Sequence, residues 1–376
     1  MKDNTVTAPI GFLANGLNCG IKKKAKLDLA LLYSVAKCKS SAVFTKNTFK
    51  ASSVKLSQKH IKNNSSQAII VNSGNANCFN KTADLSAKKM VSLTAAELGL
   101  GEGEVLVAST GIIGKELPIK KIDSAKHELV LGLSKDKGLS FAKAILTTDT
   151  KIKQSVQRIN LSGKEITLAA CAKGSGMISP DMATMLCFIT TDAAIDKKAL
   201  DSALKKAVDI SFNSITVDGQ MSTNDSVFIL ANGLAFNKVI KNNSFGYKKF
   251  FAALKYVCLD LAKQIAADGE GATKFIQLNV KQAKTEKQAK VLAKSVADSM
   301  LFKTAIHGQS NNLGRIIQAL GQTGIALKEK KIKIKSSSLK KKNICIDIVL
   351  GLGKYSATVY TCDLSKKYVD INAAYN

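Results

Sequence analysis

Short apolar runs separated by amphipathic stretches constrain the fold of this chain of 376 residues more than any other feature. The runs have the length of buried strands. Residues 196–210 instead carry apolar side chains every three or four positions, the spacing of an amphipathic helix, and Asp196 stands where an N-cap would be. The alternation of such strands and helices predicts an α/β or α+β fold. The apolar runs are 68–71, 105–108, 185–189, 227–230 and 344–350.

Two further stretches have helical spacing. Residues 87–98 form an apolar stripe that Gly99 can close as a C-cap, and a longer helical pattern covers about 247–268, where Gly269 can end it. The lysine-rich stretch 328–342 lacks such spacing, and it is predicted to be a loop or a boundary between parts of the chain.

The chain is strongly basic, with 56 Lys and Arg against 28 Asp and Glu, a formal charge of +28. Almost all of the excess is lysine, because Arg158 and Arg315 are the only arginines, and tryptophan is absent. Proteins that read nucleic acids favour arginine forks and aromatic stacking. The charge is therefore interpreted as a lysine-rich surface that keeps the protein soluble, and a polyanion partner is the alternative.

The eight cysteines indicate a reducing compartment. None forms a CxxC pair, and most stand among apolar residues, as Cys187 does. The N-terminus has no apolar segment of signal-peptide length, and the chain has no run of 18 apolar residues. A soluble cytoplasmic protein without a membrane span is expected.

Several common chemistries lack their motifs. The three histidines His60, His127 and His307 show no metal-ligand spacing, and the segment 111–115 is too short for a Walker A loop. No complete GxGxxG is present, since 269–271 and 351–353 both lack the third glycine. No metal and no resident cofactor are therefore expected.

Loops rich in glycine and small polar residues stand beside the apolar runs. Taken singly, each is best explained as a turn with local hydrogen bonds. Together they favour a polar active site assembled from several loops. The six segments are 71–77, 108–114, 147–150, 173–184, 217–225 and 268–274.

These segments together carry a family resemblance. The chain resembles the ornithine acetyltransferase family, the bifunctional glutamate N-acetyltransferases of arginine biosynthesis. The resemblance extends from residues 11–16 to residues 371–375, and its most specific part is 173–186, which reads Lys-Gly-Ser-Gly-Met-Ile-Ser-Pro-Asp-Met-Ala-Thr-Met-Leu. It implies a DmpA-like α/β sandwich, with sheets layered between helices over roughly 1–275 and a smaller C-terminal α+β region over roughly 276–376.

The resemblance implies that Thr184 is the nucleophile and that the chain cleaves itself between Ala183 and Thr184. An alpha chain of 1–183 and a beta chain of 184–376 would then assemble as an alpha2-beta2 heterotetramer. A threonine hydroxyl needs a base, and cleavage frees one. The α-amine has a pKa of about 7.7 to 8.0, so a usable fraction is neutral near pH 7.

The resemblance also implies the other site residues. Thr110 and Gly111 match the oxyanion hole, where a hydroxyl and a closely approaching glycine amide fit the task. The residues that match substrate contacts are Thr147, Lys173, Thr184, Glu270 and Asn372.

The implied reaction is ping-pong. N-acetylornithine acetylates Thr184, ornithine leaves, and glutamate takes the acetyl group to give N-acetylglutamate. Some family members also use acetyl-CoA as a co-substrate, and the sequence does not decide this point. The alternative from another class is a basic polyanion-binding protein on an inactive scaffold.

Overall fold

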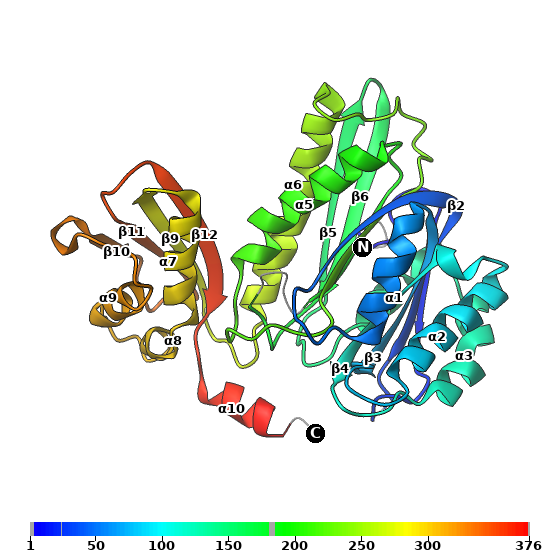
Figure 1. Cartoon of the computed structure of the whole chain (residues 1–376), viewed down its shortest axis with the longest axis horizontal. Helices are drawn as coiled ribbons and strands as arrows, with labels where there is room; N and C mark the ends of the chain where they lie inside the picture. Colours follow the sequence, from blue (N-terminus) through cyan, green and yellow to red (C-terminus); the bar gives the residue numbers. More distant parts are fainter. Residues whose placement is uncertain (1–3, 24, 180–184, 375–376) are drawn as a thin grey trace. The chain divides into compact units, whose positions relative to one another are not determined.

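The computed structural model describes residues 4–23, 25–179 and 185–374. The chain divides into two compact units, which are described separately (Figure 1). Unit 1 comprises Met1–Gly174, Asp181–Ser211 and Met221–Leu261, and unit 2 comprises Ser175–Pro180, Phe212–Gln220 and Ala262–Asn376.

Unit 1 is built on an eight-stranded sheet in the order β4-β3-β2-β8-β7-β6-β5, with β1 paired to β2. The pairs β3–β4 and β7–β8 are parallel and the other pairs are antiparallel. Four of the predicted apolar runs lie in β3, β4, β7 and β8, as expected, except that Met185 directly precedes β7. The strands are β1 (Phe12–Leu17), β2 (Leu29–Phe44), β3 (Ser66–Asn75), β4 (Val105–Ile112), β5 (Lys153–Leu161), β6 (Lys164–Lys173), β7 (Leu186–Thr191) and β8 (Ser226–Ala231).

Alternate residues of β3 and β4 enter two different cores, because successive side chains of a strand point to opposite faces. Ala68 and Ile70 pack with α2 (Ala83–Leu98) and α3 (Ile119–Leu131), whereas Ile69 and Val71 pack on the other face. Both faces of the sheet are therefore covered, which explains why these strands read as continuous apolar runs. Helix α2 ends at Gly99, whose φ of 65° makes the predicted C-cap.

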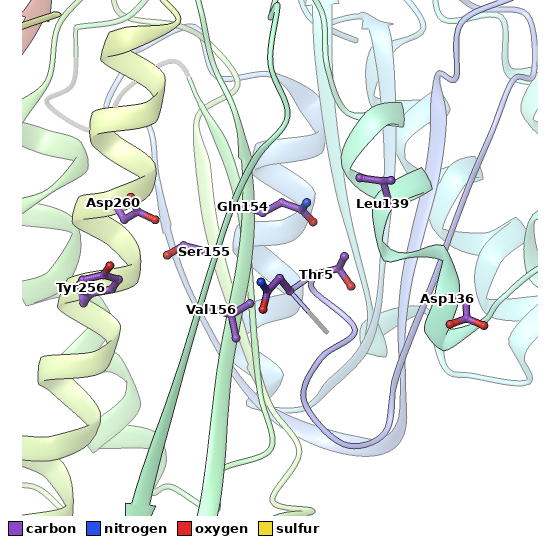
Figure 2. A pocket seen from close by; sticks show the side chains of 9 residues that line it. Thr5, Asp136, Leu139, Gln154, Ser155, Val156, Tyr256 and Asp260 are labelled. Atoms are coloured by element: carbon purple, nitrogen blue, oxygen red, sulfur yellow. The ribbon is translucent and has the colours of Figure 1, made fainter. Parts of the chain in front are cut away.

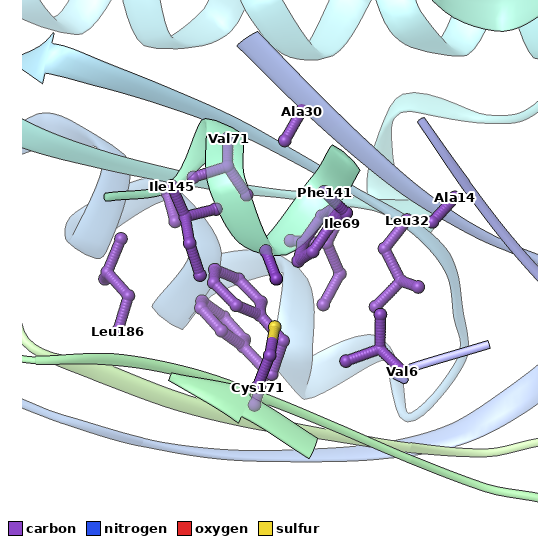
Figure 3. Packing of buried hydrophobic residues seen from close by; sticks show 14 of the residues in the cluster. Val6, Ala14, Ala30, Leu32, Ile69, Val71, Phe141, Ile145, Cys171 and Leu186 are labelled. Carbon is purple, nitrogen blue, oxygen red and sulfur yellow. The ribbon is translucent and has the colours of Figure 1, made fainter. Parts of the chain in front are cut away.

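The second core contains side chains from both halves of the sheet and from α4 (Gly138–Ala144) (Figure 3). Phe141 of α4 meets Phe188 of β7 edge to face, with ring centroids 5.2 Å apart. Phe188 in turn stacks on Phe228 of β8 at 5.7 Å. The long strand β2 pairs with β3 through its first half and with β8 through its second, so one strand joins the two halves around this core.

The outer layer on the β5–β8 side consists of α5 (Lys197–Ile210) and α6 (Phe245–Ala267). Helix α5 packs against β2, and α6 runs beside β5 (Figures 1 and 2). The side chain of Asp196 accepts a hydrogen bond from the backbone N–H of Lys198, which confirms the predicted N-cap. The stretch predicted as a long helix at about 247–268 is α6.

Unit 2 contains a four-stranded sheet in the order β10-β11-β9-β12, with its own apolar core. Helix α7 packs on β9 and β12. Its strands are β9 (Phe275–Ala283), β10 (Lys333–Ser336), β11 (Asn343–Val349) and β12 (Tyr355–Cys362), and its remaining helices are α7 (Glu286–Asp298), α8 (Met300–His307), α9 (Gly314–Gly321) and α10 (Lys366–Ala373).

The prediction for residues 328–342 is wrong in one respect. This stretch is no boundary, because β10 lies inside it and pairs antiparallel with β11 at the edge of the unit 2 sheet. Lysines alternate with Ile332 and Ile334, which pack against the core while the lysines stay exposed. Charged side chains are common on edge strands, because they discourage pairing with other chains.

The expected fold class is confirmed: layered α/β, with a smaller α+β part near the C-terminus. Within the described part of the chain, no helix combines the length and the apolar character needed to cross a bilayer.

Candidate active site

The parallel strands β3 and β4 end side by side, and Thr110 and Gly111 lie at this end of β4. Gly111 has a φ of 135°, and a Cβ at this position would lie 2.3 Å from the carbonyl carbon of Gly74 and 2.4 Å from the nitrogen of Asn75. Both atoms are backbone, so only glycine fits without moving β3. The geometry explains why position 111 of β4 is a glycine, whose backbone is not covered by a side chain of its own.

Lys173 reaches the same end of the sheet from β6. Its side chain is buried, and its Nζ donates a hydrogen bond to Thr110 Oγ1 at 3.4 Å. The structure therefore brings together three residues of the predicted site, Thr110, Gly111 and Lys173. A buried ammonium beside a hydroxyl is suited to binding a carboxylate or a developing negative charge.

Thr147 lies in the loop after α4, and Asp149 holds that loop in place. One carboxylate oxygen of Asp149 accepts from the backbone N–H of Thr147 at 3.1 Å. The other accepts from the Gly174 N–H and from Lys153 Nζ, both at 2.7 Å. One buried carboxylate thus connects two predicted site segments, the loop of Thr147 and the residue after Lys173.

The charge state of Asp149 is set by two ammonium groups. Burial by itself would raise the pKa of this carboxyl, but Lys173, Lys153 and the Gly174 N–H together hold its pKa well below the ordinary value. Asp149 is therefore ionised at neutral pH. The sequence reasoning singled out the segment 147–150 but missed this residue, although Asp149 is the one ionisable side chain in a run of threonines.

A second lysine, Lys22, forms a hydrogen bond with the same loop. Lys22 Nζ donates to the carbonyl oxygens of Leu27 at 2.8 Å and Leu146 at 2.6 Å. Burial lowers the pKa of Lys22 to about 8, and the nearby Lys173 acts in the same direction. The sequence provided no signal for this residue, because it stands in an ordinary Lys-Lys-Lys run.

Asn224 ties the loop before β8 to the ends of β3 and β4. Its amide nitrogen donates to the carbonyl oxygens of Ala76 at 2.7 Å and Ser109 at 2.8 Å. Ser109 directly precedes Thr110, so the segment 217–225 supports the predicted oxyanion residues. This contact could not be predicted, since it joins segments more than a hundred residues apart.

In unit 2, the structure places Glu270 and Asn372 together. Asn372 Nδ2 donates to Glu270 Oε2 at 2.8 Å, and the backbone N–H of Glu270 donates to the Ser175 carbonyl at 2.9 Å. A Cβ on Gly176 would lie 2.3 Å from the Glu270 carboxylate. Glu270 is buried rather than exposed in a loose Gly-Glu-Gly turn, and Gly176 makes room for it.

The predicted nucleophile Thr184 and its neighbour Ala183 lie outside the described residues. The remaining predicted residues are divided between the units, with Thr110, Gly111, Thr147 and Lys173 in unit 1 and Glu270 and Asn372 in unit 2. Among the described residues, no group of three or more His, Cys, Asp and Glu side chains is arranged to hold a metal ion.

A cavity of about 560 Å³ opens elsewhere in unit 1 (Figure 2). It lies between β5, α6, the N-terminal segment and the start of α4, and none of the predicted site residues lines it. Its polar lining includes Gln154 of β5 and Asp260 of α6. The polar loops at the strand ends, and not this cavity, are the candidate active site.

The layered fold and this site define a class of protein: an α/β enzyme whose buried lysine and polar loops suit a small anionic substrate. The model of the ArgJ family matches residues 13–376. The arginine biosynthesis bifunctional protein ArgJ of Caldanaerobacter subterraneus is 44% identical over 99% of this chain and 98% of its own. The protein of the same name from Dehalococcoides mccartyi is 43% identical over 100% of this chain and 98% of its own.

Solved structures are also similar to part of this chain. The crystal structure of ornithine acetyltransferase complexed with ornithine from Mycobacterium tuberculosis is 32% identical, covers 49% of this chain and 97% of its own, and has a TM-score of 0.45. The family model and the full-length relatives settle the assignment: the chain belongs to the ArgJ family. The resemblance drawn from the sequence motifs is thereby confirmed.

Proposed function

We propose that this chain is a self-processing acetyltransferase of arginine biosynthesis that moves an acetyl group from N-acetylornithine to glutamate. The observation that carries the proposal is the buried Lys173 ammonium, 3.4 Å from Oγ1 of Thr110, the residue before Gly111 in β4. Both substrates carry a carboxylate, which a buried ammonium can bind. The full-length relatives named as bifunctional arginine-biosynthesis proteins support the same reaction.

Processing comes first in the proposed mechanism. The Thr184 hydroxyl attacks the Ala183 carbonyl, the peptide bond shifts to an ester, and water hydrolyses the ester. Thr184 then carries a free α-amine, which can take the hydroxyl proton during acetyl transfer. Thr184 accepts the acetyl group from N-acetylornithine, ornithine leaves, and glutamate removes the acetyl group.

The other predicted residues take the following proposed roles. Thr110 and Gly111 stabilise the oxyanion that forms on the acetyl carbonyl. Thr147 and Lys173 in unit 1, and Glu270 and Asn372 in unit 2, bind substrate. Asp149 positions the Thr147 loop and Gly174 through its hydrogen bonds.

The proposal extends to the protein's surroundings. Acetyl-CoA is proposed as an optional donor, and no resident cofactor or metal is required by the mechanism. The processed chains 1–183 and 184–376 are proposed to assemble as an alpha2-beta2 heterotetramer. All eight cysteines are free thiols, which supports a reducing, cytoplasmic location.

The test combines mass and activity. The wild type is expected to split into chains of 183 and 193 residues, whereas Thr184→Ala stays at 40.1 kDa. Thr184→Ser keeps a hydroxyl nucleophile and serves as the matched control that still splits. Acetyl transfer from N-acetylornithine to glutamate should follow processing, with acetyl-CoA assayed as the second donor.

Two results would contradict the proposal. A wild type that stays whole would leave Thr184 without its amine. A processed protein that transfers no acetyl group from either donor would favour the polyanion-binding alternative. Salt-sensitive retention on DNA would test that alternative.

A further inference from the structure

The turn that carries Glu270 packs closely against the start of α10. The turn comprises residues 269–271, and Gly271 has a φ of 69°. A Cβ on Gly271 would lie 2.5 Å from the backbone nitrogen of Tyr368 in α10. The positive φ and the close backbone atom both require a glycine at this position, so the turn and the helix are built to fit each other.

Asp363 fixes the chain shortly after this turn. Its side chain is fully buried. Its Oδ1 accepts hydrogen bonds from the backbone N–H groups of Thr273 and Lys274, both at 2.8 Å. Its Oδ2 accepts from the Thr273 hydroxyl and from His307 Nδ1, the latter at 2.7 Å. Both carboxylate oxygens are thus used to hold the two residues that lead from the turn into β9.

The charge state of Asp363 suits this task. Burial by itself would raise the pKa of the carboxyl, but hydrogen bonds from Thr273, His307 and Lys274 hold its pKa below the ordinary value. Asp363 is therefore ionised at neutral pH. An ionised carboxylate offers only acceptors, which match the donors that surround it.

Thr273, His307 and Asp363 are the residue types of a hydrolytic triad, but their geometry differs from one. In such a triad the histidine contacts the hydroxyl through one ring nitrogen and the carboxylate through the other. Here the same Nδ1 lies 3.5 Å from Thr273 Oγ1 and 2.7 Å from Asp363 Oδ2. The hydroxyl donates its hydrogen to Asp363, so no base activates it as a nucleophile. The cluster holds the chain in place.

Two further contacts with the turn come from the residues that follow Asp363. Ser365 Oγ donates to the carbonyl oxygen of Gly271 at 2.6 Å. Asn372 of α10 donates to the Glu270 carboxylate at 2.8 Å. The segment 363–372 therefore holds the turn through the chain after it, through its backbone and through the Glu270 side chain itself.

We propose that Asp363 and Ser365 are positioning residues for substrate binding, because they fix the turn from which the Glu270 carboxylate extends. This inference rests on the proposed function, in which Glu270 binds substrate. N-acetylornithine and glutamate both carry an ammonium group, whose attraction to a carboxylate weakens with distance. A shift of the turn by more than about 0.5 Å should weaken binding. The proposed oxyanion residues Thr110 and Gly111 belong to unit 1 and should keep their function.

The experiment separates binding from chemistry. Wild type, Asp363→Ala and Ser365→Ala are purified after processing, and KM for N-acetylornithine and kcat are measured with glutamate as the acceptor. Asp363→Ala is expected to raise KM by about tenfold and Ser365→Ala by about threefold, with kcat changed by less than about twofold. Asp363→Asn keeps an oxygen for the two backbone N–H groups, so its KM should lie between those of wild type and Asp363→Ala.

Asp298→Ala is the matched control. Asp298 is a partly buried aspartate of unit 2 that accepts a hydrogen bond from the Thr216 hydroxyl, so its loss should lower stability. Asp298 has no hydrogen bond to the turn that carries Glu270. Its KM for N-acetylornithine should therefore equal that of the wild type. Urea denaturation gives the stability of each variant.

The outcomes separate this inference from the proposed function. If folded Asp363→Ala and Ser365→Ala keep the wild-type KM, or if Asp298→Ala raises KM as much as they do, the positioning role is wrong and the proposed function stands. If Asp363→Ala does not fold, an unchanged KM in both Ser365→Ala and Asp363→Asn overturns the inference. A wild type that transfers no acetyl group contradicts the proposed function, and this inference fails with it.

Discussion

At position 111, the absence of a single methyl group decides whether the end of β4 can lie beside β3. A Cβ there would overlap the backbone of Gly74 and Asn75, so the restriction comes from the neighbouring strand and not only from the backbone conformation of Gly111 itself. The carboxylate of Asp149 also depends on contacts beyond its own loop. Its hydrogen-bond donors are the backbone N–H of Thr147 in the same loop and that of Gly174, directly after β6.

Gly111→Ala is expected to destabilise the protein by at least about 2 kcal/mol, because the backbone conformation is strained for alanine and β3 must move. Acetyl transfer should fall as well, since the proposed oxyanion amide shifts. Urea denaturation and initial rates measure the two effects.

Gly114→Ala is the matched control for this change. Gly114 also has a positive φ, 85°, but a Cβ there meets nothing within 4 Å. Only the backbone strain of about 1 kcal/mol should appear. If Gly111→Ala and Gly114→Ala lower the free energy of unfolding equally, the contact between position 111 and β3 is unimportant.

Asp149→Asn is expected to lower the free energy of unfolding by about 3–5 kcal/mol at pH 7, because it leaves the Lys153 ammonium buried without its anion. The folded-state pKa of Asp149 lies below its unfolded value, so its stabilisation is present above about pH 4 and is lost as the pH falls. The difference between wild type and variant should therefore shrink on acidification.

Urea denaturation at neutral and acidic pH checks this expectation. Asp123→Asn is the control, since Asp123 forms an exposed pair with Lys126 on α3 and its loss should change little. If the difference in free energy of unfolding between wild type and Asp149→Asn stays constant down to pH 3, the ionisation of Asp149 does not contribute to stability.

Among the elements, α1 (Ser52–His60) protects an edge of the main sheet. Ser57 Oγ donates to the Val107 carbonyl at 2.7 Å and accepts from the Val107 N–H at 2.8 Å. His60 Nδ1 lies 2.8 Å from the Val105 carbonyl. The helix thus satisfies backbone groups of β4 that have no neighbouring strand, which hides an edge that could pair with another chain.

Ser57→Ala is expected to cost about 1–3 kcal/mol of stability, because two backbone groups of Val107 lose their partner. The Val107 amide should exchange its hydrogen markedly faster. Hydrogen exchange read by NMR or mass spectrometry tests this, with Ser124→Ala on α3 as the control, whose hydroxyl makes only a local, exposed bond to Lys120. Unchanged exchange at Val107 would mean that α1 does not seal the edge.

The helices and strands differ in how well their patterns predict them. Helix α5 follows from its apolar spacing and from Asp196, because both signals are local. Strand β10 was missed, since it is only four residues long and becomes a strand through pairing with β11. Short edge strands are defined by their neighbours rather than by their own sequence.

Over the whole molecule, the charge of +28 opposes compaction, because like charges repel across the surface. Raising sodium chloride from about 0.05 M to about 0.5 M shortens the screening length and should raise the urea midpoint. The buried Asp149–Lys153 pair is shielded from solvent, so Asp149→Asn should show the same salt increment as the wild type. A midpoint that falls with salt would contradict this expectation.

The candidate site was predicted only in part. Motif resemblance led to Thr110, Gly111, Lys173 and Glu270, because the order of residue types along each loop can be read directly from the sequence. Asp149, Lys22 and Asn224 were not identified, because their importance comes from contacts between distant loops and from burial. Burial changes the chemistry of a carboxyl or an ammonium, and no sequence pattern records it directly.

The sequence by itself determined the layered α/β class, the main helices and strands, and the family to which the chain belongs. Periodicity and loop motifs are local signals, so they can be recognised in the sequence without a structure. Only the tertiary structure decided which carboxylate is buried against lysines and which stays at the surface, as Asp149 and Asp123 do. That distinction depends on which segments meet at the strand ends, because desolvation and charge pairing act through space and not along the chain.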